Sequence, residues 1–288
     1  MPIDYDHLLG LRFPQVEHRY TERDTILYAL GCGLGLDPLD ENQLRFVYEA
    51  GLRSLPSMAV VLANPGVWYR EMDTGLDYTR IVHGEESLVL HAPLPAAATV
   101  AARTRVLDVI DKGPGRGALV ISERTIFDKS NGAPLATVTQ TAFCRGDGGF
   151  GGPPREAPKP HIIPERAADL TCALPTSPQA ALIYRLSGDP NPLHVESAAA
   201  RHAGYARPIL HGLSTFGVVC HALLRSACGY DPAPLRSMQA RFTAPVFPGD
   251  VIRTEIWRDG DVLSFRARAD ERVVIDHGRA TLVAPRVA

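Results

Sequence analysis

The chain has 288 residues, of which 45% are hydrophobic and 22% are charged, so it can form one large globular domain or two smaller ones. Its net charge of -2 gives no reason to expect nucleic acid or an anionic membrane as a partner. The first residues lack the pattern of a signal peptide, and no apolar run approaches the length of a membrane helix. Five cysteines without a Cys-x-x-Cys pair indicate free thiols in a reducing compartment. We therefore expect a cytoplasmic protein.

The predicted elements form two series along the chain. A helix over residues 21–31 begins at a threonine, and strands with β-branched alternation follow at 99–111, 117–128 and 134–144. Further helices are predicted at 176–188 and, apolar on nearly all sides, at 212–227, before strands at 237–247, 250–260, 262–270 and 272–284. Asp-Gly and glycine-rich turns between these strands favour antiparallel pairing, and a buried helix against such a sheet gives an α+β fold.

Two stretches of the first series are echoed in the second, which predicts an internal duplication. TERDTILYALG at 21–31 resembles TSPQAALIYRLSG at 176–188, and RIVHGEESLVLHAPLP at 80–95 resembles RPILHGLSTFG at 207–217. Between the series, a glycine-rich and then proline-rich segment is typical of a linker. We assign residues 1–150 to the first repeat, 151–164 to the linker and 165–288 to the second repeat.

The stretch YRLSGDPNPLHVES at 184–197 places an acid, an amide and an imidazole on one short loop. Asp189, Asn191 and His194 could simply form a well-capped turn, because Asp and Asn favour turns and prolines fix the backbone. The same three groups also suit acid/base chemistry, which needs fixed geometry between a carboxylate and an imidazole. Both interpretations are open from the residues alone.

A glycine at the start of the buried helix is the second candidate feature. Gly212 follows His211 and should expose backbone N–H groups at the positive end of the helix dipole. Such groups can hold a carbonyl oxygen that becomes negative, and glycine allows close approach. A plain helix cap is the alternative. The other histidines, such as His91, His161 and His277, show no metal-ligand spacing.

The loop resembles the motif of the MaoC-like dehydratases, or type 2 (R)-specific enoyl-CoA hydratases. Tyr184, Ser187-Gly188-Asp189, Asn191-Pro192-Leu193-His194 and Ala200 match its elements, and YALGCG, LHAPLP, GGFGG and ARFTAPVFPGD extend the likeness over both halves. The resemblance implies a double hot-dog fold, with a long helix in each half wrapped by its sheet. It also implies reversible hydration of a trans-2-enoyl-CoA to a (3R)-3-hydroxyacyl-CoA, without a metal or redox cofactor.

The resemblance also implies roles for single residues. Asp189 and His194 would be the acid/base pair, Asn191 would help to hold the water, and the Gly212 N–H would polarise the thioester carbonyl. The residues expected to contact the substrate or its CoA part are His83, Gly84, Lys112, Pro190, Pro192, Leu193 and Phe242. The first half has Asp37 but no partnering histidine, so we expect it to have lost the chemistry and to bind the acyl chain and CoA.

Several questions stay open from the sequence. A hot-dog thioesterase or a non-catalytic acyl-CoA-binding protein would share the fold and the ligand. The acyl chain, including a steroid side chain, the choice of CoA or acyl carrier protein, and homodimerisation are undetermined. We favour Asp189 as the group that activates water, with the reverse assignment open. Because no second acid/base group is evident across the site, we expect syn addition.

Overall fold

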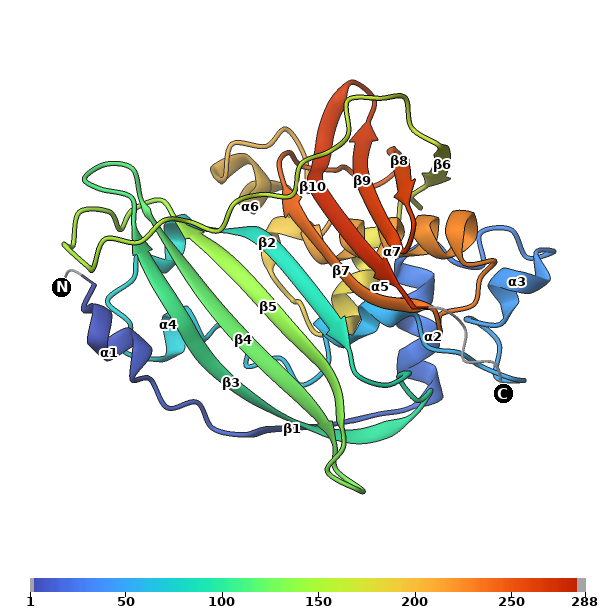
Figure 1. The fold of residues 1–288 in the computed structure, drawn as a ribbon, viewed down its shortest axis with the longest axis horizontal. Helices are drawn as coiled ribbons and strands as arrows, with labels where there is room; N and C mark the ends of the chain where they lie inside the picture. The colour runs from blue at the N-terminus through green and yellow to red at the C-terminus, as the bar shows by residue number, and fades with distance from the viewer. Residues whose placement is uncertain (1–2, 284–288) are drawn as a thin grey trace.

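The computed structural model describes residues 3–283, which form one continuous antiparallel sheet of ten strands with helices against it (Figure 1). The strands lie in the order β1-β3-β4-β5-β2-β7-β10-β9-β8-β6. Their bounds are β1 Val16–Tyr20, β2 Ile81–Leu90, β3 Ala98–Asp111, β4 Ala118–Asp128, β5 Pro134–Cys144, β6 Leu170–Pro175, β7 Leu235–Phe242, β8 Val251–Asp259, β9 Val262–Ala269 and β10 Arg272–Leu282.

The strand order confirms the duplication. From the outer edge inward, the first half runs β1-β3-β4-β5-β2 and the second half runs β6-β8-β9-β10-β7, so each strand has a counterpart. The halves meet where β2 pairs with β7. An ion pair crosses this junction, in which Arg241 Nε donates to Glu85 Oε1 at 2.7 Å. A single sheet therefore places side chains of both halves around a common interior.

The second half contains the long buried helix that the sequence predicts. This helix, α7 (Gly212–Ala227), is buried almost continuously from Ser214 to Leu224 and contacts β6, β7 and β8. Its apolar residues belong to a large core cluster that includes side chains of both halves. The remaining short elements of this half are α5 Ala180–Tyr184, η3 Arg185–Ser187, η4 Pro192–His194 and α6 Ser197–His202.

The expectation of a long helix in the first half is wrong. Among the described residues of that half, the longest helix is α2 (Glu22–Gly31), and the stretch before β2 holds only α3 Glu41–Leu44, η1 Pro56–Val60, α4 Trp68–Glu71 and η2 Tyr78–Arg80, with α1 Tyr5–Leu9 at the start of the chain. Glycines with positive φ at 33, 35, 51, 66 and 75 interrupt this stretch, and prolines break it further. The first half therefore has no counterpart of α7 beneath its sheet.

The predicted helix pair near the junction does form. The Thr21 N–H donates to the Asp24 side chain at 2.8 Å at the start of α2, as in a capping box. Helix α2 packs against α5, and the rings of Tyr28 and Tyr184 lie 5.6 Å apart. The segment predicted as one helix at 176–188 divides into α5 and the 3-10 turn η3, which ends at Gly188.

The second echo, between the two His-Gly pairs, has no structural counterpart. His83 and Gly84 lie in β2, whose equivalent strand is β7, whereas His211 and Gly212 form the start of α7. Gly84 lies at a β-bulge opposite β5. A Cβ at Gly84 would approach the Thr141 carbonyl oxygen to 3.1 Å, so the close backbone contact there favours glycine.

The linker contains no helix or strand and crosses the face of the sheet opposite the helices (Figure 1). Arg155 forms an ion pair with Asp108 at 3.3 Å, and the His161 ring lies 2.7 Å from the Ser264 hydroxyl. The linker is thus held against both halves of the sheet. Within residues 3–283, no helix combines the length and the apolar character needed to cross a bilayer.

Candidate active site

The loop between η3 and α6 is folded by its own polar side chains. Gly188 ends η3 in the left-handed region at φ 111°, which favours glycine. The Asn191 N–H then donates to Asp189 Oδ1 at 3.2 Å, and the Leu193 N–H donates to Asn191 Oδ1 at 3.1 Å. The capped-turn interpretation is therefore correct for the backbone. It leaves Asp189 Oδ2 and the Asn191 side-chain nitrogen for other contacts.

His194 is held in one orientation by a backbone carbonyl. Its Nδ1 lies 2.9 Å from the Ile209 carbonyl oxygen, and because that oxygen can only accept, Nδ1 carries the proton in the neutral ring. The basic atom is therefore Nε2. Burial lowers the pKa of His194, and the charge of Asp189 opposes this effect without cancelling it. At neutral pH, His194 is an uncharged imidazole that can accept a proton.

His211 is the residue that the sequence interpretation missed. Its ring stacks on that of His194 with centroids 3.7 Å apart, and its Nε2 lies 3.3 Å from the Asp189 backbone carbonyl oxygen. Burial is the first cause, and the neighbouring His194 the second, of a pKa lowered to about 4. A neutral His211 thus supports the His194 ring by stacking and the loop through its contact with the Asp189 backbone. The sequence feature that could have identified His211 is its position directly before Gly212 at the start of the buried helix.

Donor atoms of Asp189, His194 and His211 lie within 4.8 Å of one another, a separation that could suit a metal ion. Each histidine uses one ring nitrogen for a backbone carbonyl, which orients the ring. The buried Nδ1 of His211 has no hydrogen-bond partner among the described residues.

Gly212 lies at the N-terminus of α7, as predicted, with His211 as its N-cap. The first N–H groups of a helix have no intrahelical acceptor and carry partial positive charge. Phe242 packs beside this turn, and its ring atoms lie 3.5–3.8 Å from where a Gly212 Cβ would be. The helix end is therefore open to a small acceptor atom beside an aromatic ring.

A cavity of about 850 Å³ joins these groups and is lined by both halves of the chain. Of the predicted residues, the lining includes Asp189, Pro190, Asn191, Leu193, His194, Gly212, His83 and Phe242. Pro192, Gly84 and Lys112 are not among the described lining residues. Pro192 opens the exposed turn η4, and the Lys112 ammonium lies 4.8 Å from the Phe143 ring centre, just beyond β3.

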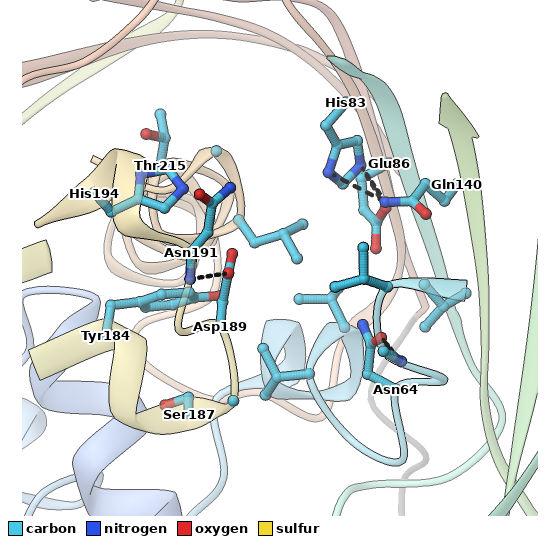
Figure 2. A pocket seen from close by; sticks show the side chains of 18 of the residues that line it. Asn64, His83, Glu86, Gln140, Tyr184, Ser187, Asp189, Asn191, His194 and Thr215 are labelled. Atoms are coloured by element: carbon cyan, nitrogen blue, oxygen red, sulfur yellow. Dashed lines mark hydrogen bonds and ion pairs between the residues drawn. The ribbon is translucent and has the colours of Figure 1, made fainter. Parts of the chain in front are cut away.

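The wall opposite the loop carries a second set of polar groups (Figure 2). His83 Nε2 lies 2.9 Å from Glu86 Oε2, Gln140 Nε2 lies 3.3 Å from His83 Nδ1, and the Tyr69 hydroxyl donates to Gln140 Oε1 at 3.3 Å. The bulge at Gly84 turns His83 and Glu86 to the same face, since they pair with Ala142 and Gln140 of β5. The premise that no second acid/base group lies across the site is therefore wrong.

The comparisons with known proteins agree with this geometry. Residues 161–277 match the MaoC like domain, and residues 18–146 match the MFE-2 hydratase 2 N-terminal domain. Enoyl-CoA hydratase ChsH3 of Mycobacterium tuberculosis is 38% identical over 90% of this chain and 91% of its own. Peroxisomal enoyl-CoA hydratase 2 of Arabidopsis thaliana is 33% identical over 93% of this chain and 91% of its own.

Solved structures give the same result for the fold. The crystal structure of a MaoC-like dehydratase from Phytophthora capsici superimposes with a TM-score of 0.84 at 32% identity and covers 96% of this chain and 98% of its own. The overall fold is thus shared along nearly the whole of both chains. The chain belongs to the MaoC-like dehydratase family, a family of hydro-lyases, in its double hot-dog form.

Proposed function

We propose that the chain catalyses the reversible hydration of a trans-2-enoyl-CoA to a (3R)-3-hydroxyacyl-CoA. The observation that carries this proposal is the meeting of Asp189, Asn191 and His194 with the Gly212 helix end in one cavity. Relatives named as enoyl-CoA hydratases, similar along nearly the whole chain, support the substrate class. In this reaction the hydroxyl of water adds to C3 of the conjugated thioester and the proton of the same water adds to C2.

The Gly212 N–H would hold the thioester carbonyl oxygen, on which negative charge develops when hydroxide adds at C3. Helix N-termini stabilise such charge through oriented N–H groups that need no reorganisation. Phe242 beside Gly212 would keep water away from this oxygen. The role depends on a backbone group, so it is consistent with glycine's lack of a side chain.

The contacts of His194 favour it as the group that takes the proton from water, the reverse of the assignment preferred from sequence. Its Nε2 is unprotonated in the neutral ring, and Asp189 is close enough to favour the imidazolium that forms. The same proton can then pass from Nε2 to C2, which leaves both groups as they began. Asp189 and Asn191 would orient the attacking water. These proton transfers involve no metal ion and no change of oxidation state.

Delivery of both parts of water from one loop leads to syn addition, and the (3R) configuration proposed here further requires the substrate to present the matching face of its double bond to that loop. His83 and Glu86 provide titratable groups on the opposite wall, so the stereochemical course becomes an informative measurement. Reaction in D₂O should place deuterium at C2 syn to the new hydroxyl. An anti product would instead assign a proton-transfer role to the opposite wall.

One assay separates hydration from the two functions that the residues alone left open, thioester hydrolysis and binding without turnover. Loss of the enoyl absorbance without release of free CoA is expected of a hydratase, whereas release of CoA would identify a thioesterase. Comparison of CoA and acyl carrier protein thioesters would identify the carrier. Cytoplasmic location and homodimerisation stay predictions.

Substitution of the pair is the direct test. Asp189→Asn and His194→Gln should each lower kcat by about 10²- to 10⁴-fold, the usual effect of losing an acid/base group. Asp37→Asn and His202→Gln, at exposed positions, are matched controls expected to keep normal turnover. Near-normal turnover of both site variants, with circular dichroism unchanged, would show that this loop does not carry the reaction.

A further inference from the structure

The part of the cavity remote from the loop contains a buried arginine that the proposed reaction does not use. Arg124 lies on β4, is 7% exposed and lines the cavity. Its Nη2 donates to the Val60 carbonyl oxygen at 2.6 Å, while its buried Nε has no hydrogen-bond partner. An unsatisfied donor on a buried charged group is costly, and because Arg124 lines the cavity, a ligand atom that accepts a hydrogen bond from its guanidinium would be favoured.

Arg124 has no ion-pair partner among residues 3–283. The nearest influence of opposite charge is Glu86, whose carboxylate favours the charged form of Arg124 from a distance but forms its own contact with His83 at 2.9 Å. The wall thus holds the guanidinium of Arg124 and the carboxyl group of Glu86 without an ion pair between them. A neutral oxygen can accept from Arg124 without repulsion by Glu86, whereas an added carboxylate would meet that repulsion.

The strand register places Arg124 along the path away from the expected CoA end. Cross-strand neighbours on the inner face are His83 with Ala142, then Glu86 with Gln140, then Leu88 with Val138, and Arg124 also pairs with Val138. Arg124 is therefore two rows beyond His83, whereas Lys112 and Phe143 lie toward the opposite end of β2. If the thioester lies at Gly212 with CoA toward Lys112, the acyl group extends toward Arg124.

We propose that Arg124 and the neighbouring polar residues Ser122 and Gln140 form a subsite for an acyl group that carries a neutral oxygen, such as a ketone or hydroxyl, remote from the thioester. Ser122 and Gln140 are direct neighbours across β4 and β5, and both line the cavity. A plain alkyl chain would cover the guanidinium of Arg124 without offering it an acceptor. The proposal rests on the proposed function for the orientation of the thioester.

Binding of saturated acyl-CoAs tests the subsite without any turnover. Sets of three acyl-CoAs of equal chain length, from octanoyl to dodecanoyl, would be compared by calorimetry. Within each set the chain is unsubstituted, has a ketone at the penultimate carbon or ends in a carboxylate. At one or more lengths, the ketone should bind wild type about 10- to 100-fold more tightly than the methyl-ended chain, the range for a hydrogen bond to a charged group. It should also bind more tightly than the carboxylate.

Arg124→Met should reduce the ketone-to-methyl ratio to about one, since replacing a buried charge by an apolar residue of similar volume is often tolerated. Arg105→Met, at an exposed arginine on the neighbouring strand, is the matched control and should keep the ratio. Arg124→Gln, which keeps a neutral donor, gives a second variant with an intermediate ratio. The wild-type ratios remain decisive if a variant fails to fold.

Equal binding of ketone and methyl chains by wild type, tightest binding of the carboxylate, or a ratio unchanged in Arg124→Met would overturn the subsite. Saturated thioesters have no double bond to hydrate, so failure of the proposed reaction is seen separately, as a stable enoyl absorbance with wild type. Each proposal can therefore fail without the other.

Discussion

At the scale of single residues, the protonation state of His194 is set by burial and by contacts with Ile209 and Asp189 that oppose the effect of burial on its pKa. The Ile209 carbonyl fixes which nitrogen carries the proton, and burial disfavours the charged ring. Asp189 on the same loop partly restores the charged form. These opposing effects suit a group that must accept a proton and then give it up. The pH dependence of the reaction therefore tests whether the neutral or the protonated ring of His194 starts the catalytic cycle.

We expect kcat/KM for hydration to rise with pH through the pKa of His194 and then to stay level at neutral pH. The neutral ring is the active form in this account, and its pKa lies below the ordinary value of about 6.5. In Asp189→Asn the midpoint should move to still lower pH, because the carboxylate that raises the pKa is gone. Profiles of both enzymes on one enoyl-CoA measure this. A rate that falls across neutral pH would mean that protonated His194 is required.

At the scale of elements, α7 carries a buried histidine that the reaction does not use. His221 Nε2 lies 3.1 Å from the Tyr230 hydroxyl, its Nδ1 has no partner, and burial lowers its pKa to about 4. The folded state therefore binds a proton less readily than the unfolded chain, where the pKa is about 6.5. The stabilising contribution is complete above that value and is lost as pH falls toward 4.

As pH falls from neutral to near 4, the lowered pKa of His221 should decrease the free energy of unfolding by about 3 kcal/mol through proton linkage. His221→Gln keeps a side chain that can contact Tyr230 but does not titrate, so its stability should fall less over the same range. Urea unfolding of both proteins at several pH values gives the comparison. Equal slopes would show that His221 contributes no acid sensitivity.

Elements with strong local signals were predictable, and those that depend on distant partners were not. The capping residues of α2, the apolar surface of α7 and the alternation of β3, β4 and β5 are local properties of the sequence. The short edge strands β1 and β6 were missed because five or six residues give little alternation. Strand β2 was missed as a strand because its bulge at Gly84 breaks the period of two.

The residues of the candidate site also fall into those that a local pattern reveals and those that depend on distant partners. The Asp189, Asn191 and His194 loop and the Gly212 helix end could be found because each lies within one short segment. Glu86 and Arg124 line the cavity from other segments and His211 supports the His194 ring, so their importance depends on burial, ring stacking and cross-strand pairing. Cross-strand partners are far apart in the chain, so no local pattern in a single sequence reveals which residues pair. Arg124 in particular belongs to a strand whose alternation predicts only that one face is buried.

At the scale of the whole molecule, the two halves interlock near their junction as well as sharing a sheet. The Ser214 hydroxyl donates to the Gly31 carbonyl oxygen at 3.1 Å, which links α7 to α2 in the interior. Gly217 of α7 lies against Cys32, and a Cβ at Gly217 would overlap Cys32 Sγ. Both halves therefore meet at a close backbone approach, and their unfolding should be coupled in one transition.

A double-mutant cycle at this contact tests the packing of the halves. Gly217→Ala should destabilise the protein by about 1 to 3 kcal/mol, the usual cost of overpacking, although alanine favours the helix itself. Cys32→Ala removes the overlapping sulfur, so the double variant should be more stable than the sum of the single effects by about 1 to 2 kcal/mol. Ser226→Ala, about 13 Å further along the helix, should instead be additive with Cys32→Ala. Unfolding midpoints and m-values of the five variants give these energies, and additivity at Gly217 would mean that α7 does not meet the first half through Cys32.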